Sequence, residues 1–251
     1  MHSTSNSKFR FESLQIPTIK ITNTKYFRTV TKPELNLDVA LTIPKDCLRE
    51  KDILNGVYFE KRRVYLNEIA NALCHQDKQN LFSDVHFGLF RGDPRKPYLM
   101  IYPAKIGETK TKFVIRIFPC LSPDNFKLDK FLPDRNLNRN KRLSESQPQP
   151  PTPHYNNAIL EDIFLTSHVE LTHLTFEESP NLVEAAKLLK VWNRQRNFDQ
   201  QKDSFNGFLF EMLLVYLLRN RKLNKEMSSY QIFKITMQFL GKILFVMSLG
   251  E

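Results

Sequence analysis

A change of hydrophobic period at a proline-rich segment is the feature that most restricts the fold. Gln147–Pro153 reads QPQPPTP, a composition typical of a polyproline II connector. Before it, apolar and aromatic residues gather in short, partly alternating runs, which favour β-strands. After it they recur every three or four residues, which favours amphipathic helices. We therefore expect an α+β domain before the connector and an all-α domain after it.

The first half is predicted to contain one long helix among short strands. Leu35–Ile43 (LNLDVALTI) alternates like a strand and is bounded by Pro33 and Pro44. Helical spacing of apolar residues then predicts one amphipathic helix over about Lys51–Leu73. Three aromatic and β-branched runs, separated by the turn-rich GDPRKP and KIGETK, predict a meander of strands: Val85–Phe90, Tyr98–Tyr102 and Phe113–Phe118.

The second half is predicted to be helical throughout. Two helix N-caps are predicted, one at Ser179, which is followed by Pro180 at the first helical position, and one at Ser228. The predicted helices are Ala158–Leu174, Leu182–Phe198, Phe205–Leu218 and Tyr230–Phe245. The expected organisation is a disordered lead-in over 1–20, an α+β domain over 21–146, a connector over 147–155 and a truncated helical domain over 156–251.

Charge and composition favour an acidic partner. Lys and Arg outnumber Asp and Glu by 37 to 27, a net charge of +10. This suits RNA or an anionic surface, although a merely solvated basic surface is the alternative. The three cysteines, Cys47, Cys74 and Cys120, have neither disulfide-framework nor zinc-site spacing, which fits a reducing compartment. The N-terminus lacks a secretory h-region and the apolar run Phe208–Leu218 is short for a membrane span, so no membrane partner is expected.

The first predicted strand lacks the acids that nucleotidyl transfer needs. Two metal ions about 3.5–4 Å apart require carboxylates two residues apart on a strand, because alternate side chains share a face. Asp38 is present, but Ala40 follows it, and Glu34 would lie about 13 Å away. Arg116 stands in the later strand where a third carboxylate is expected. No catalytic residue, metal site or cofactor is therefore predicted.

Histidines and the single tryptophan are better explained by structure than by chemistry. His168 and His173 are five residues apart, about 140° around a helix, and cannot chelate one ion. Trp192, near Lys190 and Arg194, has the position of a stacking platform, but its apolar helical surroundings favour core packing.

Two groups of cations are candidate RNA contacts. Lys61, Arg62 and Arg63 lie on the first predicted helix, where three consecutive residues spread over about 200° and mostly decorate a solvated face. The preferred contact is a flexible, Asn-rich arm before the connector, which would bind phosphates through counterion release; an ordinary solvated loop is the alternative. Its cations are Lys127, Lys130, Arg135, Arg139, Lys141 and Arg142.

Long runs of the sequence resemble one known family. The runs are Pro33–Leu66 (PELNLDVALTIPKDCLREKDILNGVYFEKRRVYL), Pro150–Asp162 (PPTPHYNNAILED) and Leu188–Leu218 (LLKVWNRQRNFDQQKDSFNGFLFEMLLVYLL). They resemble the Nrap, or nucleolar protein 6, family over about Ile21–Leu240. The resemblance implies a nucleotidyltransferase-like mixed-sheet domain followed by a helical domain similar to those of poly(A) polymerases and oligoadenylate synthetases. Family chains are several-fold longer, so this chain corresponds to their first domain pair, in the manner of a short isoform or a truncated chain.

The same resemblance implies a function without catalysis. Family members are regarded as inactive scaffolds of the small-subunit processome, in agreement with the residues at 38, 40 and 116. We expect a nuclear, nucleolar scaffold that binds pre-ribosomal RNA and processome proteins in pre-rRNA processing, and no DNA. The alternatives are a template-independent RNA nucleotidyltransferase, against which Ala40 weighs most, and a protein-docking fragment that does not bind RNA.

Overall fold

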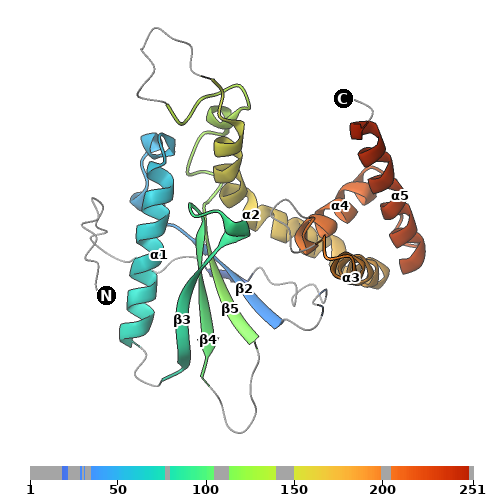
Figure 1. Ribbon diagram of the computed structural model, residues 1–251, viewed down its shortest axis with the longest axis horizontal. Coiled ribbons are helices and arrows are strands. Elements are labelled where there is room, and N and C mark those ends of the chain that lie inside the picture. Colours follow the sequence, from blue (N-terminus) through green and yellow to red (C-terminus); the bar gives the residue numbers. More distant parts are fainter. Residues whose placement is uncertain are drawn as a thin grey trace. The chain divides into compact units, whose positions relative to one another are not determined.

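The computed structural model describes residues 19–21, 29, 31, 35–76, 80–104, 113–139, 150–198 and 205–248 (Figure 1). The chain divides into two compact units. The first comprises residues 1–22 and 36–166, and the second comprises residues 23–35 and 167–251. Asp38 and Arg116 both belong to the first unit.

A five-stranded mixed sheet forms the frame of the first unit. Its order is β1-β2-β5-β4-β3, and its strands are β1 (Ile19–Ile21), β2 (Leu35–Thr42), β3 (Phe82–Leu89), β4 (Pro97–Pro103) and β5 (Phe113–Cys120). β3, β4 and β5 form the predicted antiparallel meander, and β1 is antiparallel to β2. β2 and β5 run parallel, because Asp38 contacts Arg116 and Thr42 contacts Cys120 with the same sequence offset.

One face of this sheet is covered by α1 (Val57–Gln76) and by the first half of α2 (Pro153–Glu177). Apolar residues of α1 recur at helical spacing and are buried, among them Tyr58, Tyr65, Leu66 and Ile69. They pack with Leu41, Leu99, Ile101 and Ile159 in one core. The predicted helix start at Lys51 is wrong by a few residues, because Asn55 and Gly56 take left-handed φ values of 55° and 80°.

Short 3₁₀ turns connect the elements of the first unit: η1 (Lys45–Cys47), η2 (Glu50–Ile53), η3 (Phe90–Gly92) and η4 (Leu128–Phe131). The predicted domain boundary at 147–155 differs from the division between the compact units, which falls inside α2 after Thr166. The reason is that α2 starts at Pro153 and first packs into the core of the sheet through Tyr155, Ala158, Ile159 and Ile163.

The second unit is helical, as predicted. It contains the end of α2, α3 (Pro180–Gln195), α4 (Gly207–Arg219) and α5 (Ser229–Ser248). Ser179 Oγ accepts from Leu182 N, and Ser228 Oγ accepts from Gln231 N, so both predicted N-caps are confirmed. Trp192 is partly buried against the helical core and lies 5.7 Å from Phe198, centroid to centroid. No described helix is long and apolar enough to cross a membrane.

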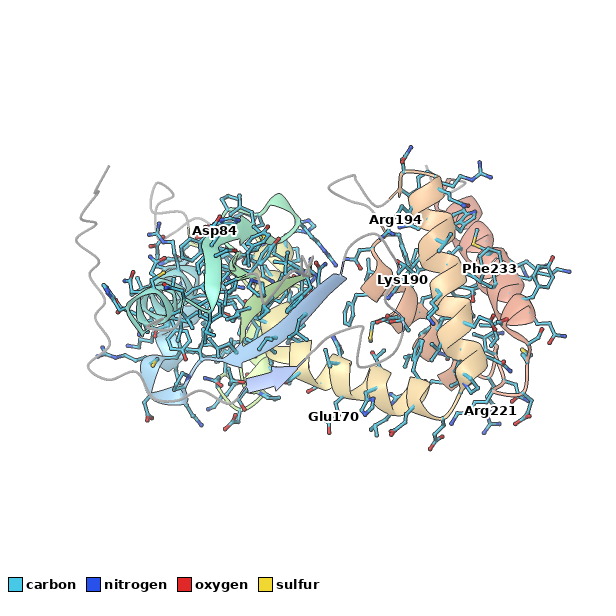
Figure 2. All side chains as sticks on the ribbon, turned by 90° about the horizontal axis from the view of Figure 1, so that it is seen from below. Asp84, Glu170, Lys190, Arg194, Arg221 and Phe233 are labelled. Atoms are coloured by element: carbon cyan, nitrogen blue, oxygen red, sulfur yellow. The ribbon has the colours of Figure 1, made fainter. Side chains whose placement is uncertain are left out.

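A buried ion pair lies inside this helical unit. Lys190 of α3, labelled in Figure 2, donates to Glu211 Oε1 of α4 at 2.5 Å, and their side chains are 10% and 1% exposed. Thr29, which is fully buried, donates to the same carboxylate oxygen at 2.6 Å. Thr29 is thus fixed to α3 and α4, a connection that sequence periodicity does not reveal.

Candidate functional site

The strand position at which a two-metal nucleotidyltransferase would bind its ions carries an ion pair. Asp38 lies on β2 and Arg116 on the parallel neighbour β5, so their side chains share the sheet face opposite the core. Arg116 Nε donates to Asp38 Oδ1 at 2.6 Å and Arg116 Nη2 donates to Oδ2 at 2.7 Å. Both oxygens of the only carboxylate on β2 therefore accept from one guanidinium, in the bidentate geometry that Arg favours.

The surroundings of this pair hold Arg116 in place. Its guanidinium carbon lies 5.6 Å from the centroid of Phe118, and Phe118 stacks on Tyr98 at 4.9 Å. Tyr98 in turn crosses Gly88 so closely that a Cβ there would lie 2.5 Å from its ring. A row of contacts thus runs from β2 through β5 and β4 to β3.

The donor set of this face does not fit a pair of divalent metal ions. Ala40, which is fully buried, has no oxygen to offer, and the cationic Arg116 stands beside Asp38. Glu34 lies outside the described residues. Within the described part of the chain, no group of three or more His, Cys, Asp or Glu side chains is placed to hold a metal ion.

His168 of the second unit is partly buried, and this desolvation lowers its pKa.

The prediction that the α1 cations decorate a solvated face is wrong for Lys61 and Arg62. Their relative exposures are 9% and 1%. Lys61 pairs with Asp52 at 2.7 Å and donates to the carbonyl of Cys47, so its side chain is committed within the protein. Arg63 alone is exposed, and it pairs with Glu60 one turn earlier. The α1 triplet is therefore not a cluster available to phosphates.

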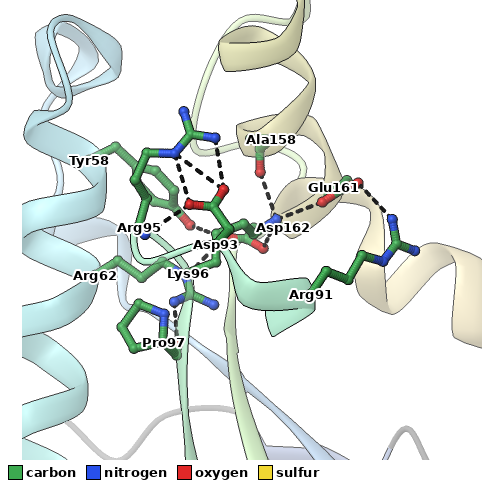
Figure 3. A network of polar contacts seen from close by, with 10 residues as sticks. All are labelled: Tyr58, Arg62, Arg91, Asp93, Arg95, Lys96, Pro97, Ala158, Glu161 and Asp162. Carbon is green, nitrogen blue, oxygen red and sulfur yellow. Dashed lines mark hydrogen bonds and ion pairs between the residues drawn. The ribbon is translucent and has the colours of Figure 1, made fainter. Parts of the chain in front are cut away.

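Arg62 belongs to a buried charge cluster centred on Asp162 of α2 (Figure 3). Asp162 Oδ2 accepts from Arg62 Nε at 2.9 Å and from the Tyr58 hydroxyl at 2.8 Å, and Oδ1 lies 3.0 Å from Lys96 Nζ. Lys96 also donates to Glu161 and to the carbonyl of Ala158. Burial, followed by the negative charge of Asp162, holds the pKa of Tyr58 well above its ordinary value. The cluster joins α1, α2 and the start of β4.

The segment predicted as a flexible arm, 124–142, is folded onto the first unit over its described part, 124–139. Phe126, Phe131 and Leu137 are buried in the first core. Asn55 donates its backbone N–H to the carbonyl of Leu137, and its side-chain oxygen accepts from the N–H of Arg139, both at 2.8 Å. The left-handed Asn55 therefore clamps the end of this segment. The predicted contacts Lys141 and Arg142 lie outside the described residues.

This folding gathers the described cations of the segment around a pocket of about 370 Å³. Five positive side chains and two carboxylates line it: Lys51, Lys127, Lys130, Arg135 and Arg139 against Glu50 and Asp129. Among the residues that the structure describes, none of the five cations lies within 4.0 Å of a carboxylate. We call these five residues the basic cluster. Its excess positive charge suits the phosphates of a nucleic acid.

Lys51 is the member of the basic cluster that the sequence pattern does not reveal. Helical spacing predicts it as the first residue of a helix, whereas it lies in η2 and lines the pocket with a segment some 80 residues later. The alternation of apolar Phe126, Phe131 and Leu137 with cations was the available signal that the arm would fold back onto the domain.

Family models match both halves of the chain. An α+β domain of the nucleotidyltransferase-like class comes first and a helical domain follows it, and residues 181–247 match the Nrap protein PAP/OAS-like domain. Residues 1–178 match Nrap protein domain 1. The chain therefore belongs to the Nrap family.

Curated relatives extend this match. Nucleolar protein 6 of Xenopus tropicalis is 38% identical over 238 residues, which cover 93% of this chain and 20% of the relative. Human nucleolar protein 6 is 38% identical over 219 residues, covering 85% and 19%, and the Drosophila willistoni protein is 32% identical over 212 residues, covering 81% and 17%. The chain thus spans about one fifth of the length of the curated relatives that it matches.

Two solved structures are distantly similar. One is the E. coli MS115-1 CdnC:HORMA-deltaN complex, with a TM-score of 0.46 and 14% identity over 90% of this chain and 56% of that chain. The other is terminal uridylyl transferase 4 from Trypanosoma brucei with bound UTP and UpU, with a TM-score of 0.40 and 13% identity over 85% and 52%.

Proposed function

We propose that the chain is a non-catalytic, RNA-associated scaffold in small ribosomal subunit biogenesis, where it binds pre-ribosomal RNA and proteins of the small-subunit processome. Its curated relatives are named nucleolar proteins, and the chain acts in the nucleolus, within the nucleus. The single observation that carries the non-catalytic part is the ion pair of Asp38 with Arg116.

That ion pair removes the usual route to phosphoryl chemistry at this face. A two-metal mechanism needs carboxylate oxygens free to bind both ions. Asp38 gives both of its oxygens to Arg116, and the next residue on the same face is Ala40. A metal ion at Asp38 would have to displace the bidentate guanidinium of Arg116, and the nearby positive charge of that guanidinium would repel it. This arrangement supports the non-catalytic part of the proposal.

The RNA-binding part rests on the basic cluster. Lys127, Lys130, Arg135 and Arg139 are exposed, and the buried Phe131 and Leu137 fix the backbone that carries them. Cations held on ordered backbone can contact successive phosphates with little loss of conformational freedom on binding. We assign the cluster as the phosphate contact of the first unit, and we assign no contact to the buried Lys61 and Arg62.

Neutralising four of the five residues of the basic cluster is expected to weaken RNA binding about 10- to 100-fold at physiological salt. The variant replaces Lys127, Lys130, Arg135 and Arg139 with glutamine, all at exposed positions, so the fold should persist. Loss of four phosphate contacts to single-stranded RNA should also reduce the slope of log K against log[salt] by roughly 2–3. Fluorescence anisotropy with a labelled single-stranded RNA across a salt series measures both quantities.

A matched control carries the same charge change elsewhere. Arg196, Arg219, Lys222 and Lys234 are exposed residues of the second unit, again two arginines and two lysines. Their replacement by glutamine should leave most of the affinity and most of the salt slope intact. Equal losses in the two variants would mean that net charge, and not the basic cluster, determines binding, and no RNA binding by the unaltered chain would contradict the proposal outright.

A further inference from the structure

β3 is the terminal strand of the sheet, next to β4 alone (Figure 1). It is eight residues long, Phe82–Leu89, and within the described part of the chain no strand pairs with its outer edge. Such an edge presents unpaired backbone donors and acceptors, which natural proteins usually cover, twist or guard with charge. The edge of β3 therefore requires a physical explanation.

The hydrogen-bond pattern identifies the residues whose backbone groups face outward. Phe90 donates its N–H to the carbonyl of Lys96 across the turn at 3.0 Å. Backbone groups alternate between the two sides of an antiparallel strand, so Gly88 and His86 also direct theirs toward β4, and Val85, Phe87 and Leu89 direct theirs outward.

Pro97 supports this assignment independently. It lies opposite Leu89, it has no N–H, and its carbonyl accepts from Arg62 Nη1 at 2.5 Å. Pro97 therefore cannot donate to the carbonyl of Leu89, as expected for a position of β3 whose backbone groups face away from β4. The N–H and carbonyl of Leu89 lie on the outer edge, in line with those of Phe87.

The side chains beside these outward groups are large, apolar and exposed. Phe87 is 46% exposed and Leu89 is 51% exposed. Both share the side of the sheet on which Val85 packs against the first core. Residues directly opposite each other on paired strands share a face, so a further strand would place its own side chains against Phe87 and Leu89.

We propose that the outer edge of β3 is a docking site for an extended segment of another protein, which pairs with Val85, Phe87 and Leu89 as an additional strand. The edge and its partner are electrostatically complementary. The N–H donors and carbonyl acceptors of β3 alternate at strand spacing, and the backbone of another extended segment presents the matching acceptors and donors. The segment should carry apolar residues at alternate positions, opposite Phe87 and Leu89. This site lies apart from the basic cluster and does not depend on RNA binding.

The test uses the full chain and short synthetic peptides in which valine alternates with threonine, lysine or glutamate. At least one peptide is expected to slow hydrogen exchange at the amides of Phe87 and Leu89 about tenfold or more, without slowing exchange in α3–α5. The same peptide with its pairing amides N-methylated, which cannot donate hydrogen bonds, should have no effect. Replacing Phe87 and Leu89 by lysine should abolish the slowing while retaining the fold, because both side chains are about half exposed.

Four outcomes would overturn the proposal. They are no slowing by any peptide, equal slowing by the N-methylated peptide, slowing by single-stranded RNA alone, and slowing that rises with the concentration of the chain itself, which would make a second copy the occupant. Phe87→Pro, which deletes an outward N–H, gives a further check against Phe87→Thr, which keeps it. Peptide protection that survives in the proline variant and is lost in the threonine variant would count against edge pairing.

Discussion

Replacing Asp162 with alanine is expected to lower the free energy of unfolding of the first unit by about 3–5 kcal/mol. The carboxylate is the shared partner of Arg62, Lys96 and Tyr58, and the two cations have side chains only 1% and 4% exposed. Without Asp162, Arg62 would keep only the carbonyl of Pro97 among these contacts. A buried guanidinium without its counterion costs several kcal/mol, because its hydration is not restored.

The measurement is urea unfolding followed by circular dichroism, together with hydrogen exchange at the β4 and β5 amides. Glu60→Ala is the matched control, since it removes an acid that pairs with Arg63 on the surface, where both side chains are more than half exposed. That change should stay within about 0.5 kcal/mol. A loss below about 1 kcal/mol for Asp162→Ala would mean that water or a rearranged Glu161 stabilises the two cations, and would contradict a structural role for the buried carboxylate.

Replacing Glu211 with alanine is expected to destabilise the helical unit by about 3 kcal/mol. The change leaves Lys190, which is 10% exposed at its side chain, beside the neutral Thr29 alone. Gly207 lies against the carbon stem of Lys190, since a Cβ there would approach Lys190 Cε to 2.9 Å. The ammonium group therefore has little room to swing toward α4 in search of another partner.

Trp192 is the only tryptophan of the chain and packs against the helical core, so its fluorescence reports the unfolding of this unit. Glu178→Ala is the control, because Glu178 pairs with Lys225 at the surface. Glu211→Ala should shift the fluorescence transition strongly and Glu178→Ala hardly at all. Similar shifts in both variants would show that the buried ion pair does not stabilise the helical unit beyond a surface pair.

Local patterns in the sequence were sufficient for most of the fold. Alternation in LNLDVALTI predicted β2, and Ser179 with Pro180 predicted the start of α3. Both are short-range features, governed by strand alternation and by capping. The juxtaposition of Asp38 and Arg116 also followed, since the missing carboxylate was sought on a later strand facing the same way.

Contacts between polar residues that are distant in the sequence could not be predicted from local patterns. The sequence predicts a solvated face for Lys61 and Arg62, because no local pattern indicates that Asp52 and Asp162 reach them in the folded protein. Charged side chains are usually exposed, but they can be buried where the fold places an oppositely charged side chain within ion-pair distance. The basic cluster was found in part, yet its order depends on Asn55, a residue about 80 positions earlier than Leu137 and Arg139.

The most direct test of the scaffold account combines binding and catalysis in one gel. The purified chain is incubated with a labelled single-stranded RNA, Mg²⁺ and all four nucleoside triphosphates, over a series of salt concentrations. A non-catalytic RNA-binding scaffold should retard the RNA, release it steeply as salt rises and leave its length unchanged, for the unaltered chain and for Asp38→Ala alike. Magnesium-dependent lengthening of the RNA that disappears in Asp38→Ala would contradict the proposal.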